Sequence, residues 1–335
     1  MIDPFERFFQ SLPAQHPFIY VDVGAMGGLA SHWQPLSNLM TVVAFEPDPR
    51  ECSKLCAQKN FKVFPYFLFS RRKAVKFLIS QQAGLSSCYT PNFDVLKYFP
   101  QVERYTTVEQ KEFSGEEVSS LDELFEQRQL YEGDFIKLDT QGSELEIIQG
   151  GKKFFRNFFG AEIEVEFASL YQDQPLFRDI DRQMDELGFQ IVDLRRAFWK
   201  RKVCTAYQGH GQLVFGDALY FRKLPHWIND LKALPVGSQV RSKILKSVIT
   251  CLVYRLPDYA LDIVQASQEQ GLIEDVFSRE IQGWIQQHVK RRSVSTFPGR
   301  EFLAKLLRKG SEVLRPQSHL EFSDGDRFLG NIRSK

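Results

Sequence analysis

The residues best suited to chemistry are a glycine turn and an acid that follows it at a fixed distance. An apolar run at residues 18–23 contains Asp22 and leads into the turn at 24–28, Gly-Ala-Met-Gly-Gly. Glycine lets a backbone approach a ligand closely and accepts the positive φ values that such turns need. A second apolar run ends in Glu46, and a carboxylate about 20 residues beyond the turn suits the two hydroxyls of a ribose. Together these features predict a pocket for a nucleotide-like cofactor.

Asp22 decides between types of cofactor. A dinucleotide site is typically marked by G-x-G-x-x-G, whereas this chain reads D-x-G-x-x-G-G from Asp22 to Gly28. An acid two residues before the first glycine suits the amino-acid cation and the sulfonium of S-adenosylmethionine. We therefore expect that cofactor, and a nicotinamide-dependent oxidoreductase is the less favoured alternative.

Short β-rich runs alternate with helical periods and predict seven strands, at residues 18–23, 41–46, 61–69, 134–139, 161–167, 189–194 and 212–221. Strands that alternate with helices are typical of a parallel, doubly wound sheet. The last two strands are joined without a clear helix, so we expect the seventh to run antiparallel to its neighbour. This is the α/β topology of a Rossmann-like class I methyltransferase.

The chain changes character after residue 224. Residues 1–17 form a lead-in and residues 18–224 the predicted catalytic domain, whereas 225–308 contain three amphipathic patterns that predict a helical extension. Apolar faces of this width must pack on the domain, on one another or on a second chain, so a homo-oligomer is one expectation. Residues 309–335 are polar and contain glycine and proline, which predicts a flexible tail.

Four of the expected strands end in acids. Ligands of an open α/β sheet bind outside the carboxyl ends of its strands, and these ends carry Asp22, Glu46, Asp139 and Glu166. Acids at this edge stabilise a cationic methyl donor, and an acid beside the acceptor can take a hydroxyl proton. We expect Asp139 and Glu166 to be catalytic, with a helix cap as the alternative role for Asp139.

The fifth strand has an unusual pattern for a buried parallel strand, which should be apolar throughout. Glu162, Glu164 and Glu166 alternate with apolar residues. We expect Glu162 and Glu164 to pair with lysines or arginines of the helices, because an unpaired buried carboxylate is costly. His210 is the third catalytic candidate, since it lies between glycines just before the seventh strand; an exposed turn is its alternative setting.

Residues 135–151 resemble a signature of the FkbM-type methyltransferases, a lysine-apolar-aspartate strand end followed by glycine, a small residue and a glutamate that opens a helix. Further stretches look like family signatures in the same order, at residues 22–28, 45–48, 84–87, 91–92, 164–167, 170–171, 174–177 and 216–219. The resemblance covers residues 18–224. Met26 and Arg71 depart from the family pattern, and these departures affect contacts to the cofactor and to its adenine side.

The resemblance implies methyl transfer from S-adenosylmethionine to an oxygen, often a hydroxyl of a sugar or glycan or of a secondary metabolite. The residues expected to hold the cofactor are Asp22, Gly24, Ala25, Gly28, Glu46, Pro47 and Ser70. The alternative from another class is a non-catalytic, cofactor-binding scaffold protein whose helical extension recruits a partner.

Composition narrows the remaining possibilities. The 335 residues include 43 basic and 42 acidic side chains, and a net charge of +1 does not indicate a nucleic-acid binder or a polybasic membrane protein. Five scattered cysteines are typical of reduced thiols in the cytoplasm, and Cys52 and Cys56 lack a second ligand pair for zinc, so no metal is expected. We expect a cytoplasmic enzyme without a signal peptide or a transmembrane segment.

Overall fold

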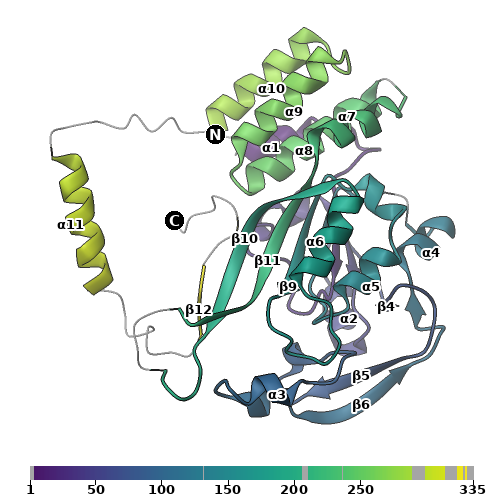
Figure 1. Cartoon of the computed structure of the whole chain (residues 1–335). Coiled ribbons are helices and arrows are strands. Elements are labelled where there is room, and N and C mark those ends of the chain that lie inside the picture. The colour runs from purple at the N-terminus through teal and green to yellow at the C-terminus, as the bar shows by residue number, and fades with distance from the viewer. Residues whose placement is uncertain are drawn as a thin grey trace.

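The computed structural model describes residues 4–130, 132–205, 210–235, 237–288, 299–313, 323–326 and 329. Its main sheet has the order β12-β10-β11-β9-β8-β1-β2-β3 (Figure 1). The bounds of these strands are β1 (Ile19–Val23), β2 (Thr41–Phe45), β3 (Phe61–Phe64), β8 (Phe135–Leu138), β9 (Gly160–Glu166), β10 (Phe189–Trp199), β11 (Gln212–Arg222) and β12 (Ser323–Gly325).

The pairing of the strands confirms the predicted topology. β3, β2, β1, β8 and β9 run parallel, and β11 is antiparallel to both of its neighbours, β9 and β10. The last predicted strand therefore inserts between the fifth and the sixth. A mostly parallel sheet with an antiparallel strand at one end is the expected Rossmann-like arrangement, here with helices on its faces.

The run at 61–69 is not one strand, and this prediction was wrong. It divides at Pro65 into β3 and the short β4 (Phe67–Leu68), which pairs with β7 (Val118–Ser119) instead of the main sheet. Proline cannot donate a ladder hydrogen bond, so it ends the pairing with β2.

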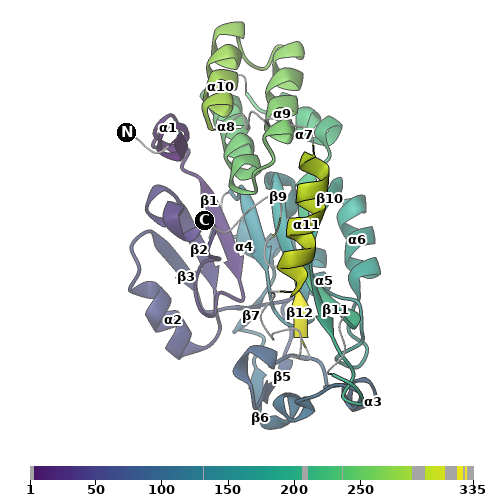
Figure 2. The same cartoon turned by 90° about the vertical axis from the view of Figure 1, so that its left-hand side faces the viewer.

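A further pair of antiparallel strands was not expected from the sequence. It consists of β5 (Val75–Ser80) and β6 (Thr107–Phe113) and lies near the carboxyl ends of the sheet strands (Figure 2).

Local sequence explains where the helices begin and end. Asp48 caps α2 by accepting a hydrogen bond from the Arg50 N–H, and Pro49 occupies the first turn, where its missing N–H costs nothing. The described helices are α1 (Pro4–Gln10), α2 (Pro49–Cys56), α3 (Phe93–Leu96), α4 (Leu121–Glu126), α5 (Glu144–Gln149), α6 (Phe177–Glu186), α7 (Leu224–Lys232), α8 (Ser238–Val253), α9 (Pro257–Glu269), α10 (Asp275–His288) and α11 (Arg300–Val313), with 3-10 turns at Gln34–Leu39, Ala83–Leu85, Val102–Tyr105 and Phe154–Asn157.

Helices α7 to α10 share a hydrophobic core with the sheet. Tyr20 and Phe135 from the strands belong to the same buried cluster as Ile244 and Val248 of α8. Two buried lysines of α8 also reach the sheet: the Nζ atoms of Lys243 and Lys246 each lie 2.9 Å from a carboxylate oxygen of Asp134, just before β8. The helices therefore pack near the amino ends of the parallel strands (Figure 1). The division at residue 224 into a domain and an extension remains a prediction.

Part of the predicted tail is ordered against the sheet. β12 pairs with the outer edge of β10, Asp326 forms an ion pair with Arg196, and Leu329 is buried. Helix α11 extends to Val313, and the other residues beyond it lie outside the described part of the chain. Within that part, no helix has both the length and the apolar content needed to cross a membrane.

The shared core makes a prediction about stability. Ile249 of α8 is fully buried in the cluster that contains Tyr20 and Phe135. Ile249→Ala should lower the free energy of unfolding by about 2–5 kcal/mol, because it leaves a cavity in a close-packed core. Denaturant unfolding followed by circular dichroism measures this loss. Val276→Ala on α10, where the side chain is exposed, is the control and should change little. Equal stability of both variants would show that α8 does not pack on the sheet.

Candidate cofactor and acceptor site

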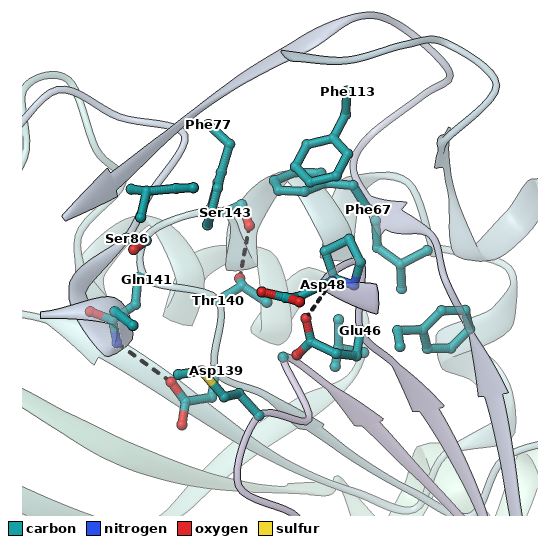
Figure 3. A pocket seen from close by; sticks show the side chains of 18 of the residues that line it. Glu46, Asp48, Phe67, Phe77, Ser86, Phe113, Asp139, Thr140, Gln141 and Ser143 are labelled. Carbon is teal, nitrogen blue, oxygen red and sulfur yellow. Dashed lines mark hydrogen bonds between the residues drawn. The ribbon is translucent and has the colours of Figure 1, made fainter. Parts of the chain in front are cut away.

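A cavity of about 780 Å³ opens at the carboxyl ends of β1, β2, β8 and β9. Its volume lies within the range of ~300–1,000 Å³ that is usual for small-molecule sites. Gly24, Glu46 and Asp139 directly follow the ends of β1, β2 and β8, and Glu164 lies on β9. Residues of β5 and β6, among them Phe77 and Phe113, form the opposite wall (Figure 3). Ligands of α/β sheets bind at this edge.

Glu46 presents its carboxylate to the cavity (Figure 3). One oxygen, Oε1, accepts a hydrogen bond of 2.9 Å from the Asp48 N–H, which fixes the side chain at the end of β2. Burial raises the pKa of Glu46. The neighbouring Asp48 behaves differently, because hydrogen bonds from Arg50 lower its pKa to about 2. Pro47 and Asp48 also line the cavity, so the motif of residues 45–48 forms one side of it.

The glycine turn meets the end of β8. Gly24 has a φ of +79°, and a Cβ atom at this position would lie 2.0 Å from the carbonyl oxygen of Asp139. Only glycine allows this approach. The group that requires glycine at position 24 is therefore the backbone at the end of the adjacent strand, whereas from the sequence only a ligand was expected there. Ala25 is buried against Ala44 and Leu55, outside the cavity lining.

Asp22 lies one step deeper in β1, opposite Lys137 of β8. It is buried and is not part of the cavity lining, and its Oδ1 has no hydrogen-bond partner among the described residues. Burial raises its pKa to about 7, although the charge of Lys137 opposes this shift. A buried acceptor without a hydrogen bond lowers the stability of the folded state unless another group donates a hydrogen bond to it.

The wall opposite the strands is apolar and largely aromatic. Phe67, Phe77 and Phe113 line the cavity and contact one another, with ring centroids of Phe67 and Phe113 5.1 Å apart. They extend from β4, β5 and β6 over the strand ends (Figure 3). Flat aromatic groups pack favourably on such rings. This wall was not expected from the sequence, because the pairing of β5 with β6 was not expected.

Glu144 organises the loop between β8 and α5. Its carboxylate accepts hydrogen bonds from the N–H groups of Thr140, at 2.6 Å, and Gly142, at 2.9 Å. The loop turns sharply, since Gln141 has a φ of +57° and Gly142 a φ of +111°. A non-glycine residue in this left-handed conformation is uncommon and often occurs at functional sites. The loop thereby directs the Gln141 side chain toward Asp139 (Figure 3).

Asp139, Gln141 and Glu164 form the polar floor of the cavity. The Gln141 Nε2 donates to Oε2 of Glu164 at 2.5 Å, and Lys137 Nζ donates to Asp139 Oδ2 at 2.8 Å. Burial alone would raise the pKa of Asp139, but the charge of Lys137 and its hydrogen bond hold this pKa below the ordinary value. Burial and then the negative charge of Asp139 raise the pKa of Glu164 well above its usual range. The pKa values of these two neighbouring acids are therefore shifted in opposite directions.

The partners of the strand-five acids differ from those expected. Glu162 accepts a 2.6 Å hydrogen bond from the Tyr254 hydroxyl and lies 3.5 Å from His32. Among the described residues, no lysine or arginine of a helix forms an ion pair with it. Glu164 is bound by Gln141 instead of a helix cation. Both predictions of lysine or arginine pairing were therefore wrong, because neutral donors and a histidine satisfy these carboxylates.

Four other predicted site residues lie off the cavity lining. Glu166 is buried at the end of β9, and its Oε2 has no partner among the described residues. His210 is exposed and its ring contacts that of Phe198 in a tilted arrangement, with ring centroids 5.0 Å apart. Ser70 lies against Gly150 at the end of α5, and Gly28 lies near Gln58. Their assignment to catalysis or cofactor binding remains a prediction.

Several cavity residues were absent from the sequence prediction, among them Met26, Asp48, Phe67, Phe77, Ile79, Ser86, Glu109, Lys111, Phe113, Thr140, Gln141, Ser143 and Glu164. Some of these lay within stretches already singled out, such as 84–87 and 135–151. Gln141 lies two residues after the strand-ending Asp139, and this position was the signal available for it. No sequence signal pointed to Glu109 and Lys111, because only the pairing of β5 with β6 brings them to the cavity.

The raised pKa of Asp22 predicts how stability depends on pH. The folded chain keeps this proton up to about pH 7, whereas the unfolded chain loses it near pH 3.8. The folded state therefore binds more protons in this range, and the free energy of unfolding falls as pH rises through it. Asp22→Asn removes this contribution, so the variant should gain stability relative to the wild type toward the upper end of the range.

Denaturant unfolding near both ends of the range tests this prediction. Asp94→Asn is the control, because this exposed acid makes a surface pair with Lys97 that contributes little. A difference between Asp22→Asn and the wild type that stays constant with pH would contradict a raised pKa at Asp22.

Comparison with known proteins gives a family match over residues 22–191, to the family described as the methyltransferase FkbM domain. No curated protein matches the chain in sequence. The match includes the glycine turn, Glu46 and the whole loop after β8.

Solved structures to which the chain is similar include the methyltransferase FkbM of Methylobacillus flagellatus, with 14% identity and a TM-score of 0.32 over 64% of this chain and 47% of that chain. Another is the precorrin-6y C5,15-methyltransferase of Geobacter metallireducens, with 14% identity and a TM-score of 0.29 over 65% and 88%. A third is a TehB-like SAM-dependent methyltransferase of Corynebacterium glutamicum, with 12% identity and a TM-score of 0.30 over 67% and 89%. The assignment to a family rests on the sequence match, which spans half of the chain: the chain belongs to the FkbM methyltransferase family.

Proposed function

We propose that the cavity binds S-adenosylmethionine and that the chain transfers its methyl group to a hydroxyl oxygen of a small molecule or glycan. The observation that carries the proposal is the convergence of Gly24, Glu46 and Asp139 on one cavity of about 780 Å³. These residues end three neighbouring parallel strands, and each belongs to a stretch that the family match covers.

The residues present fit this cofactor. Glu46 supplies a carboxylate for the ribose hydroxyls, and Phe67, Phe77 and Phe113 supply an apolar wall for a flat base. The Gly24 turn brings backbone to the cavity without a side chain. Asp22, two residues before Gly24, has a buried oxygen without a hydrogen-bond partner among the described residues, which supports its predicted role toward a cationic group. Ala25 and Gly28 shape the same turn from outside the lining.

Bound S-adenosylmethionine supplies an activated methyl group to an acceptor oxygen. Most of the rate comes from holding the acceptor in line, which is worth more than a base in a direct displacement. Asp139 is placed to accept the hydroxyl proton, because it lines the cavity and stays ionised beside Lys137. The carboxyl group of Glu164, whose pKa is raised by burial, and the amide of Gln141 can orient the hydroxyl through hydrogen bonds. Glu166 and His210 remain candidates that need a rearrangement to reach the acceptor.

The acceptor class follows from the family resemblance, which implies a sugar, glycan or secondary-metabolite hydroxyl. We propose a cytoplasmic enzyme without a nucleic-acid acceptor. Incubating the full chain with trideuteromethyl S-adenosylmethionine and an extract of the source cells tests this. A product that gains one labelled methyl on oxygen supports the proposal. Methylation on nitrogen or carbon contradicts O-methyl transfer, and cofactor binding without any product favours a scaffold protein instead.

Glu46 should control cofactor affinity. Glu46→Ala should weaken binding of S-adenosylmethionine by roughly 1.5–3 kcal/mol, the range for a hydrogen bond to a charged group. Glu46→Gln keeps an acceptor for the Asp48 N–H and separates loss of charge from loss of loop geometry. Isothermal calorimetry measures both. Glu51→Ala on α2 is the control and should bind like the wild type. Unchanged affinity of Glu46→Ala would contradict the assignment.

The negative charge of Asp139 should increase the rate of methyl transfer. Asp139→Asn should lower the single-turnover rate by about 10²–10⁴-fold, the usual contribution of a general base. Rapid-quench kinetics with the labelled acceptor identified above measures this loss, and the variant rate should no longer fall as pH is lowered. Glu166→Gln and His210→Ala, measured alongside, test the other two candidates. A full rate in all three variants would mean that water takes the proton.

A further inference from the structure

Helix α11 differs from the other C-terminal helices because its apolar face is uncovered. Phe302 is 71% exposed, Leu306 56% and Leu307 66%, and Leu303 is also exposed. Figure 1 shows the helix standing apart from the sheet and from α7 to α10. Helices of this length are marginal in water without a partner, since isolated helices below about 12–15 residues rarely persist. The face therefore needs something to cover it.

The four apolar side chains form a compact patch. Phe302 and Leu306 are one helical turn apart, as are Leu303 and Leu307, so they occupy two neighbouring rows on one face. The patch is short: the residues seven positions after Phe302 and Leu303 are Lys309 and Gly310. Helices that bind protein grooves usually continue their anchors through such positions. A broad patch of two turns instead suits shallow burial in a soft apolar layer.

Charge points to the nature of that layer. Arg300 and Lys305 are exposed on the same helix, and the sequence from residue 290 to residue 309 has one acid, Glu301, against Lys290, Arg291, Arg292, Arg300, Lys305, Arg308 and Lys309. The chain as a whole is nearly balanced, with 43 basic and 42 acidic residues, so this concentration is local. Like charges disfavour pairing of this helix with the same helix of a second copy.

We infer that α11 is an interfacial helix that docks the protein on an anionic lipid surface. Phe302, Leu303, Leu306 and Leu307 enter the boundary between headgroups and acyl chains, and Arg300 and Lys305 contact lipid phosphates. Basic residues beside Phe and Leu on an amphipathic helix are the pattern of peripheral membrane binding. The overall charge of +1 conceals this property, which is why composition alone did not indicate it. The inference is independent of the cofactor proposed above.

Sedimentation of the full chain with vesicles tests the inference. Vesicles of equimolar phosphatidylcholine and phosphatidylglycerol should bind the protein, and vesicles of phosphatidylcholine alone should bind it much more weakly. Arg300→Gln and Lys305→Gln should each weaken binding about fivefold. High salt should weaken it as well, because the Debye length shrinks to ~3 Å at 1 M.

The apolar patch has a matched control. The double variant Phe302→Ser with Leu306→Ser should weaken binding to anionic vesicles at least about tenfold. Val276→Ser on α10 removes an apolar side chain that is also 71% exposed and should leave binding unchanged. All of these side chains are exposed, so the variants should keep the wild-type thermal unfolding curve.

Three results would overturn the inference. The first is no sedimentation of the wild type with anionic vesicles. The second is equal binding by the patch variant and the wild type. The third is a dimer by light scattering that the patch variant converts to a monomer without any vesicle binding, which would mean that a second copy covers the face.

Discussion

The edge of the sheet depends on the buried ammonium group of Lys137. This residue of β8 lies in register with Asp22 on one side and Glu162 on the other, and its Nζ donates to Asp139 at 2.8 Å. Acids that end neighbouring parallel strands crowd negative charge into a region with little water. A buried cation keeps part of that charge in its ionised form, and its loss would leave carboxylates uncompensated. Lys137 thus lowers the pKa of Asp139 at this edge of the sheet.

Two acids in one cavity are therefore affected differently. Contact with Lys137 lowers the pKa of Asp139, whereas burial and the negative charge of Asp139 raise the pKa of Glu164. Glu164 is thus the acid of the pair that holds a proton more readily. Gln141 bridges them and is held in an unfavourable backbone conformation by the Glu144 carboxylate.

The sequence predicted the sheet well because apolar strands between helical periods are a strong local signal. It also predicted that Gly24, Glu46 and Asp139 lie at one site, because parallel strands bring their carboxyl ends to one edge of the sheet. It did not reveal the aromatic wall, because β5 and β6 are charged on one side and pair with each other instead of the main sheet. Placing Glu166 and His210 depended on side-chain direction, which residue type and spacing do not define.

The packing of α8 has a consequence for how the chain is made. Tyr20 and Phe135 share a buried cluster with Ile244 and Val248, which lie more than a hundred residues later in the sequence. Contacts of such long range slow folding, because a large loop must close before they form. During synthesis, the aromatic face of the sheet stays open to water until α8 has left the ribosome. The nascent chain is therefore most prone to aggregation at the stage when its cofactor motifs are already complete.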